Sequence, residues 1–252
     1  MATANLEKLQ LADDFAVYAN SGAEFETQFL YKEIFGDNCY DTGPLPEDAV
    51  IIDAGANIGM FSLYIKRQCP GARITAFEPA PDTAAALRLN LALHEVHGVE
   101  VHECALGSQD CEMKLTYFPN MPGNSTLHGD DEPAIFAGEV GRAHPVARLR
   151  EERREVPVPV RRLSNVLRLM PGLVRVDLLK IDVEGAELDV LRGLDDDHWE
   201  VVRRIVMEVG DEHGDLAAAE TLLRRRGFEV VSERAPWAPE TLPMYTLMAR
   251  RR

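Results

Sequence analysis

The sequence has little of several features that mark large classes of protein. It carries only four cysteines, without a C-x-x-C pair and without paired histidines nearby: Cys39, Cys69, Cys104 and Cys111. A zinc site is therefore not expected, and in a reducing compartment these side chains would be free thiols. No apolar run approaches the length that spans a membrane, so no membrane partner is expected.

Basic residues are also scarce. The chain has 27 Lys and Arg against 42 Asp and Glu, which gives a formal net charge of -15 at pH 7. A nucleic-acid enzyme needs a basic track across its surface, whereas the basic cluster at 148–154 is interleaved with acids. Nucleic acid is therefore not expected as a partner. The first ten residues lack the basic and apolar regions of a signal peptide, which favours a cytoplasmic protein.

A glycine turn after an apolar run is the most informative stretch that is present. Residues 50–62 read V-I-I-D-A-G-A-N-I-G-M-F-S and begin as a strand buried on both faces. Gly55 lets the backbone approach a ligand, and Gly59 lets a helix pack close to the strand. Asn57 is placed to cap that helix. Strand, turn and helix form the first unit of a doubly wound α/β domain.

Two acidic residues indicate the ligand of this unit. A dinucleotide fingerprint has three glycines and an acid about twenty residues later. Here Asp53 precedes the turn, where a carboxylate repels a pyrophosphate and attracts a cation. Glu78 ends the next apolar stretch, where a carboxylate accepts hydrogen bonds from ribose hydroxyls. A ligand that is cationic at one end and a nucleoside at the other fits both, and S-adenosylmethionine is that ligand.

Four short motifs resemble the FkbM-type methyltransferases: D-A-G-A-N-I-G at 53–59, F-E-P at 77–79, C-A-L-G at 104–107 and K-I-D-V-E-G-A-E at 180–187. The resemblance covers about residues 29–232. It implies S-adenosylmethionine-dependent O-methylation of a hydroxyl on a small molecule, such as a polyketide-type or sugar-containing secondary metabolite. The acceptor would arrive alone or tethered to a carrier protein. The F-E-P motif also places Pro79 beside the cofactor.

Seven predicted strands alternate with helical patterns. They predict an α/β fold of the class I methyltransferase (Rossmann-like) type, with a seven-stranded, mostly parallel sheet, helices on both faces and an antiparallel final pair. In this architecture the third strand ends next to the adenine. Ala105 and Leu106 are therefore candidates for backbone contact with the base, with a simple strand exit as the alternative. The expected strands are about 50–53, 73–78, 99–104, 176–182, 204–208, 228–232 and 244–249.

Residues 1–49 are expected to form a helical lid packed over the cofactor end of a methyltransferase domain that spans 50–252. Short helices are expected around Leu6 to Val17, and a second apolar face lies over 25–35. Tyr40, just before a loop rich in glycine and proline, is either a ligand contact or part of an edge strand and turn.

The composition changes again between 119 and 155, where prolines and glycines are followed by R-L-R-E-E-R-R-E. Long loops inside compact domains are usually functional or disordered, so an insertion before the fourth core strand is expected to form a substrate-facing flap. V-P-V-P-V at 156–160 predicts an edge strand, because proline cannot donate to a strand ladder.

Transfer of a methyl group to an alcohol requires a base or a bound cation, because a neutral hydroxyl is a poor nucleophile. Asp182 ends the fourth strand beside the expected methyl position, and Lys180 shares its face of the strand. Asp182 is the first candidate for both cofactor contact and catalysis, with a helix-capping role as its alternative. His213 is the candidate general base. In a second arrangement, Asp182 and Glu208 hold a magnesium ion.

Three other functions are alternatives to O-methylation. N-methylation of a small amine or amide needs no strong base and differs only in its acceptor. A non-catalytic cofactor-binding module is disfavoured by the intact motif residues. A nicotinamide oxidoreductase is disfavoured because its diphosphate would lie against Asp53. The sequence makes no prediction of oligomeric state.

Overall fold

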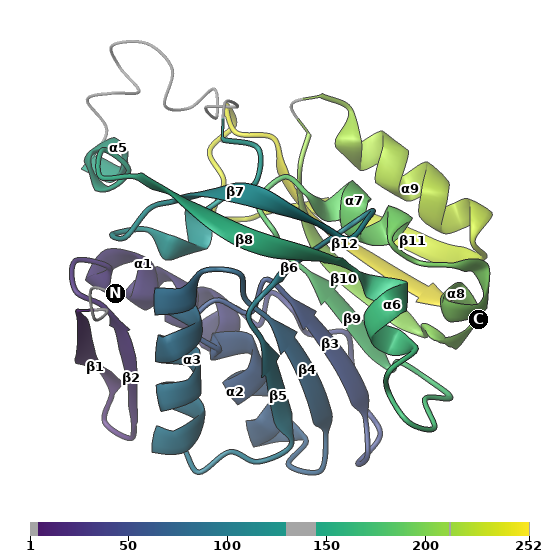
Figure 1. Cartoon of the computed structure of the whole chain (residues 1–252), viewed down its shortest axis with the longest axis horizontal. Helices are drawn as coiled ribbons and strands as arrows, with labels where there is room; N and C mark the ends of the chain where they lie inside the picture. Colours follow the sequence, from purple (N-terminus) through teal and green to yellow (C-terminus); the bar gives the residue numbers. More distant parts are fainter. Residues whose placement is uncertain (1–4, 130–144, 212, 252) are drawn as a thin grey trace.

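The computed structural model describes residues 5–129, 145–211 and 213–251, and a mixed seven-stranded sheet crosses the molecule (Figure 1). The strand order is β11-β12-β10-β9-β3-β4-β5. β12 is antiparallel to both of its neighbours, and the other pairs are parallel, which confirms the predicted mostly parallel sheet. The strands are β3 (Val50–Ala54), β4 (Arg73–Phe77), β5 (Val99–His102), β9 (Leu178–Ile181), β10 (Arg204–Gly210), β11 (Phe228–Arg234) and β12 (Met244–Arg251).

Helices cover both faces of this sheet, because its central strands carry apolar side chains on both sides. On β3, Ile51 packs into one core and Ile52 into the other. The first core also takes side chains from α2 (Met60–Gln68) and α3 (Pro81–Leu93). The second takes them from α6 (Leu163–Leu167), α7 (Glu187–Arg192), α8 (Asp196–Val201) and α9 (Asp215–Arg225).

The N-terminal segment differs from the predicted helical lid. Its first part is an antiparallel hairpin of β1 (Leu6–Ala12) and β2 (Phe15–Asn20). Phe15, Val17 and Ala19 are fully buried at a spacing of two, so strand periodicity decided the structure. α1 (Glu24–Tyr31) and the π-helix η1 (Lys32–Gly36) then follow, as the apolar face over 25–35 predicted. The hairpin lies beside α3 (Figure 1).

A second sheet has the order β6-β8-β7, built from β6 (Ala105–Gly107), β7 (Cys111–Tyr117) and β8 (Arg154–Arg162). The predicted third core strand therefore ends early, at His102. The edge-type prediction for 156–160 holds for residues 156–159, which pair only with β7 among the described strands, although β8 as a whole is the middle strand of this sheet. β8 tolerates its two prolines because β6 pairs only with residues 160–162, beyond Pro159.

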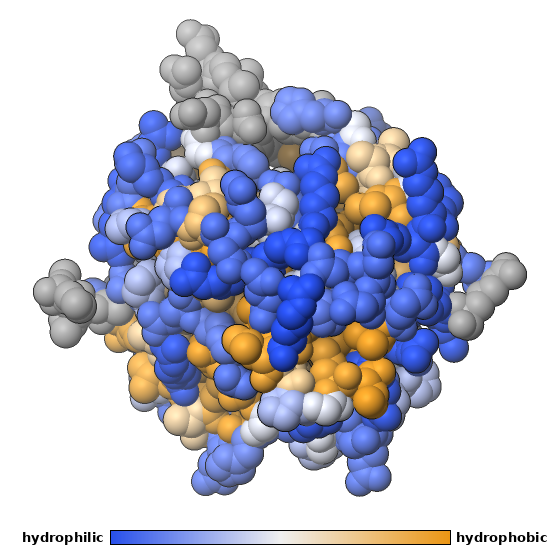
Figure 2. Space-filling view, turned by 45° about the vertical axis from the view of Figure 1, so that its right-hand side comes forward, coloured by the Kyte–Doolittle hydropathy of each residue, from blue (hydrophilic) through white to orange (hydrophobic). Residues whose placement is uncertain are grey.

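The predicted insertion contains the 3-10 helix η2 (Pro122–Asn124) and α5 (Pro145–Leu149), while its residues 130–144 lie outside the described part. No helix in the described ranges combines the length and the apolar character needed to cross a membrane. On the face drawn in Figure 2, hydrophilic side chains cover the middle, and apolar side chains come to the surface mainly in the lower half.

Candidate functional site

The turn between β3 and α2 has room only for glycine at its centre. Gly55 has a φ of +78°, and a Cβ added there would lie 1.7 Å from the backbone oxygen of Asp182. The turn and the end of β9 are therefore in direct backbone contact. Gly59, with a φ of +90°, occupies the N-cap position of α2, which has no side-chain cap. The predicted capping role of Asn57 is wrong, because α2 begins only at Met60.

Asp182 lies directly after β9 and is held on one oxygen. The Tyr40 hydroxyl donates a hydrogen bond of 2.9 Å to Asp182 Oδ2, and Lys180 Nζ lies 3.4 Å from the same atom. The Asp182 side chain is 26% exposed, so its carboxylate lies at the boundary between the protein interior and the site. The predicted juxtaposition of Asp182 and Lys180 is present.

Lys180 is buried and bridges two carboxylates. Its Nζ lies 3.5 Å from Asp53 Oδ1 and donates a 2.6 Å hydrogen bond to the Gly55 backbone oxygen. Burial alone would lower the pKa of Lys180, but the charges of Asp182 and Asp53 raise it above its ordinary value. Lys180 is therefore a fixed positive charge beneath the turn.

Asp53 differs from the expectation of a carboxylate open to a cationic ligand. It is fully buried, and the Ser62 hydroxyl donates a 2.8 Å hydrogen bond to its Oδ2. Because Asp53 faces Lys180 across the strand pair, its charge supports Lys180 and leaves no surface for a ligand.

Glu78 lies at the tip of β4, where it holds two backbone segments together. One oxygen accepts a 2.9 Å hydrogen bond from the Asn57 amide, and the other accepts one of 2.9 Å from the Ala80 amide. Burial raises the pKa of Glu78 to about 7. Glu78 therefore joins the glycine turn to the loop that contains Pro79, and its predicted contact with a ribose stays a prediction.

A pocket of about 180 Å³ lies against β6. Leu106, His128 and Ala186 are among its lining residues, whereas Ala105 is not. Leu106 thus lines a cavity, and the predicted contacts of Ala105 and Leu106 with the adenine base stay predictions.

Residues 122–126 join the N-terminal segment to the loop after β9. Both carboxylate oxygens of Glu26, on α1, accept hydrogen bonds from the Gly123 amide, at 3.0 and 3.1 Å. The Thr126 hydroxyl donates a 2.6 Å hydrogen bond to the Glu184 backbone oxygen. Glu26 is a site residue that the sequence analysis does not predict. Its place beside the apolar face of a predicted helix was the one local sign that its carboxylate would be buried.

The alternative role of Asp182, capping the helix that follows, is wrong, because α7 has Ala186 at its N-cap position and no side-chain cap. Glu187 Oε1 accepts hydrogen bonds from the amides of Val183, at 3.2 Å, and Gly185, at 3.0 Å. Glu187 therefore holds the loop between β9 and α7, and the Asp182 side chain has no part in capping that helix.

Buried acids gather around this region, and burial raises their pKa values. The pKa of Glu26 rises to about 8, and those of Glu33 and Glu187 rise to about 7. For Glu208, burial and then the charge of Asp182 raise the pKa well above its ordinary value. Several of these groups carry protons near neutral pH.

These raised pKa values predict that the ligand-free protein loses stability as the pH rises. Glu26, Glu33, Glu78 and Glu187 hold protons more tightly folded than unfolded, so their stabilising contribution is complete below about pH 4.5. It is lost as the pH rises through their folded values of about 7 to 8. The thermal midpoint should fall by about 5 °C or more between pH 5.5 and 8.5.

The variant Glu26→Gln is the control for this measurement, because an amide oxygen still accepts from Gly123 but does not ionise. Its midpoint should match the wild type at pH 5.5 and exceed it at pH 8.5. A wild-type midpoint that rises across this range would contradict the prediction.

His213 is less closely tied to Asp182 than the sequence suggested, whereas Glu208 is near enough for the charge of Asp182 to raise its pKa. His213 is exposed in the loop between β10 and α9. Among the described residues, no hydrogen bond or ion pair joins it to Asp182. Within the same part of the chain, neither Asp182 nor Glu208 belongs to a close group of three metal-binding side chains. The predicted magnesium site gains no support.

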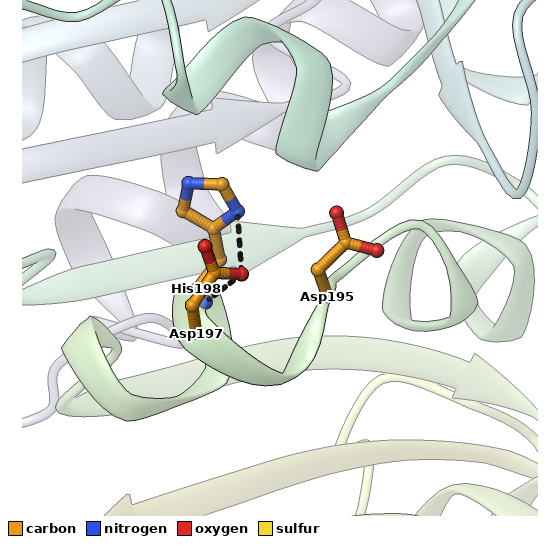
Figure 3. A group of neighbouring side chains, drawn as sticks. All are labelled: Asp195, Asp197 and His198. Carbon is orange, nitrogen blue, oxygen red and sulfur yellow. Dashed lines mark hydrogen bonds and ion pairs between the residues drawn. The ribbon is translucent and has the colours of Figure 1, made fainter.

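One such group does occur at the start of α8, formed by Asp195, Asp197 and His198 (Figure 3). Asp195 forms ion pairs with Arg162 and Arg168, which hold its pKa at about 2. His198 Nδ1 lies 2.9 Å from Ser164 Oγ. We infer that this group fixes α8 against α6 and does not hold a metal ion, because Arg162 and Arg168 already neutralise the Asp195 carboxylate.

Comparison with known proteins places the chain in a family. The Methyltransferase FkbM domain model matches residues 53–230. Methyltransferase 1 of Beauveria bassiana is 53% identical over 98% of both chains. The 31-O-demethyl-FK506 methyltransferase FkbM of Streptomyces tacrolimicus is 38% identical over 92% of both chains.

A solved structure gives a fold-level match. The crystal structure of Methyltransferase FkbM from Methylobacillus flagellatus aligns with a TM-score of 0.52 at 14% identity, over 82% of this chain and 45% of the other. At that identity the likeness concerns the fold alone, and it agrees with the mixed sheet described above. With the family match over most of the chain, the conclusion is plain: this protein belongs to the FkbM family of methyltransferases.

Proposed function

We propose that this protein is an S-adenosylmethionine-dependent O-methyltransferase that acts on a hydroxyl of a small secondary metabolite. The observation that carries the proposal is the position of Asp182. Its carboxylate is held on Oδ2 at the edge of the site, and its backbone lies directly against the glycine turn of a methyltransferase fold.

The residues at the strand ends fit a ligand with a nucleoside and a cationic end. Because Gly55 has no side chain, the glycine turn packs directly against the backbone of Asp182, and the two segments meet at one edge of the sheet. Asn57 Oδ1 is buried in this turn and has no hydrogen-bond partner among the described residues, so it has an acceptor to offer a ligand. Glu78 and Asp182 supply carboxylates on neighbouring loops. S-adenosylmethionine would bring a methyl group on a good leaving group, and the protein would orient it.

We assign to Asp182 the role of binding the acceptor, and to Lys180 the role of holding Asp182 in place. An acceptor hydroxyl that donates to Asp182 Oδ1 would be aimed at the methyl group, and correct placement supplies much of the rate enhancement. The acceptor oxygen would form a bond to the methyl carbon as the carbon–sulfur bond breaks. The hydroxyl proton would leave to a base. Lys180 is buried behind the turn, keeps its charge because Asp182 and Asp53 flank it, and holds Asp182.

The identity of the base stays a proposal with two candidates. His213 retains the role predicted from sequence and lies in the exposed loop after β10. Glu208 lies on β10 itself, and burial followed by the charge of Asp182 raises the pKa of its carboxyl group well above its ordinary value, which makes it more basic than an exposed glutamate. Loss of activity in His213→Gln or in Glu208→Gln would separate them.

Support for a hydroxyl acceptor comes from a relative. The Streptomyces tacrolimicus relative, which is 38% identical to this chain, is named as a methyltransferase of a 31-O-demethyl compound, which describes methylation at an oxygen. We extend this to a polyketide-type or sugar-containing acceptor, alone or carrier-tethered, bound near the described parts of the N-terminal segment and of the 119–155 insertion. An amine acceptor is the alternative.

The test is methyl transfer from labelled S-adenosylmethionine to matched acceptors. A polyketide alcohol, its O-methyl ether and its amine analogue are offered separately, each with and without EDTA. We expect label on the alcohol only, an equal amount of S-adenosylhomocysteine, and no effect of EDTA. Label on the amine alone would establish N-methylation, and loss of activity with EDTA would restore the metal hypothesis. Binding of S-adenosylhomocysteine without any transfer would favour a cofactor-binding module.

A further inference from the structure

We propose that Tyr40 is a positioning residue for methyl transfer, and that it acts by holding the Asp182 carboxylate so that only Oδ1 faces the acceptor. This inference rests on the proposed function. It concerns a residue that lies outside the 53–230 segment matched by the family model.

The geometry divides the two oxygens of Asp182. Oδ2 receives the hydroxyl of Tyr40 at 2.9 Å and the ammonium of Lys180 at 3.4 Å. No hydrogen bond to Oδ1 is present among the described residues, and the side chain is 26% exposed. One oxygen is therefore anchored to the protein, and the other is left for a ligand.

Lys180 alone would not fix this carboxylate. Its shortest contact is the 2.6 Å hydrogen bond to the Gly55 oxygen, and its charge is shared with Asp53 at 3.5 Å. The 3.4 Å separation from Asp182 supplies charge but little direction. The shorter bond from Tyr40 supplies the direction.

Tyr40 is itself held in place. It is buried, its ring packs edge-on against Phe61 with centroids 5.5 Å apart, and Lys180 Nζ lies 5.5 Å from its ring centroid. Burial and the charge of Asp182 raise the pKa of Tyr40 well above its ordinary value, so the hydroxyl stays a donor across the working pH range. The turn after η1 therefore completes the site from outside the sheet.

The experiment compares Tyr40 and Tyr64, two buried tyrosines of the same hydrophobic core. In Tyr40→Phe the hydroxyl that holds Asp182 is removed. In the control Tyr64→Phe the hydroxyl that is removed contacts Asn38 Oδ1, at 3.1 Å, instead. We expect Tyr40→Phe to lower kcat about 10- to 100-fold, because hydrogen bonds to charged groups are worth that much. KM for both substrates should change by less than about threefold, and Tyr64→Phe should keep the wild-type kcat.

A double-mutant cycle with Asp182→Asn tests whether Tyr40 acts through Asp182. The double variant should be no slower than Asp182→Asn alone. A wild-type kcat in Tyr40→Phe, an equal loss in Tyr64→Phe, or a fully additive loss in the double variant would each overturn the inference.

Two further points keep the outcomes separate. A wild-type protein that transfers no methyl group refutes the proposed function, whereas an active wild type with an unaffected Tyr40→Phe refutes only the role of Tyr40. If Tyr40→Phe does not fold, 3-fluorotyrosine is placed at position 40 or at position 64. It keeps the ring and strengthens the donor, and kcat should change only at position 40.

Discussion

Gly55→Ala is expected to weaken binding of S-adenosylhomocysteine at least about 100-fold, a loss of about 2.7 kcal/mol in binding free energy. The added Cβ would lie 1.7 Å from the Asp182 backbone oxygen, so either the glycine turn or the end of β9 must move. Both segments carry the residues proposed to hold the cofactor. Isothermal titration calorimetry with S-adenosylhomocysteine measures the effect.

Gly43→Ala is the matched control for this prediction. Gly43 has a φ of +83°, similar to that of Gly55, but a Cβ there would meet nothing within 4 Å. Both variants carry the strain of alanine at positive φ, about 1 kcal/mol, and only Gly55→Ala adds the clash. Gly43→Ala should bind the ligand as the wild type does. Equal affinities in all three proteins would show that the turn does not contact the cofactor.

Lys180→Met is expected to lower the free energy of unfolding by about 3–5 kcal/mol, because it leaves two buried or half-buried carboxylates without their cation. Asp53 is fully buried, so its charge has no solvent to replace the ammonium. The variant also loses the 2.6 Å hydrogen bond to the Gly55 oxygen. Urea denaturation of the ligand-free protein at pH 7 measures the loss.

Two companion variants make this result specific. Lys114→Met removes an exposed lysine that forms an ion pair with Glu155 at 2.6 Å, and it should hardly change the unfolding midpoint because solvent screens such pairs. Asp53→Asn combined with Lys180→Met removes one charge of each sign and should recover part of the stability. If Lys114→Met and Lys180→Met lower the free energy of unfolding by the same amount, burial of the Lys180 ion pairs contributes nothing to stability.

Local signals identified the parts of the site that depend on short stretches of chain. Glycine spacing and the apolar run before it predicted the β3–α2 turn, because positive φ and close backbone approach leave a direct mark on residue choice. The apolar stretches likewise placed Glu78 and Asp182 at strand tips. Alternation along β9 placed Lys180 and Asp182 on one face, as the structure has them.

Predictions from short stretches were wrong where a helical and a strand periodicity fit the same residues. Leu6 to Val17 carries apolar residues at spacings that suit both a helix and a strand, and the hairpin formed because α3 offers β2 a surface to pack on. Ala105 to Gly107 continued a strand pattern but left the main sheet, because β8 offers them a partner. In each case a distant surface decided between locally acceptable structures.

By itself, the sequence determined the fold class, the glycine turn and the carboxylates at the strand ends, because each leaves a pattern within about thirty residues of chain. Only the tertiary structure decided which of those charges reach a ligand. Lys180 meets Asp53 through strand pairing, and Tyr40 meets Asp182 across 142 positions. Contacts of that separation depend on strand order and on how the N-terminal segment packs, so the burial of Asp53 and the anchoring of Asp182 appear only in the folded chain.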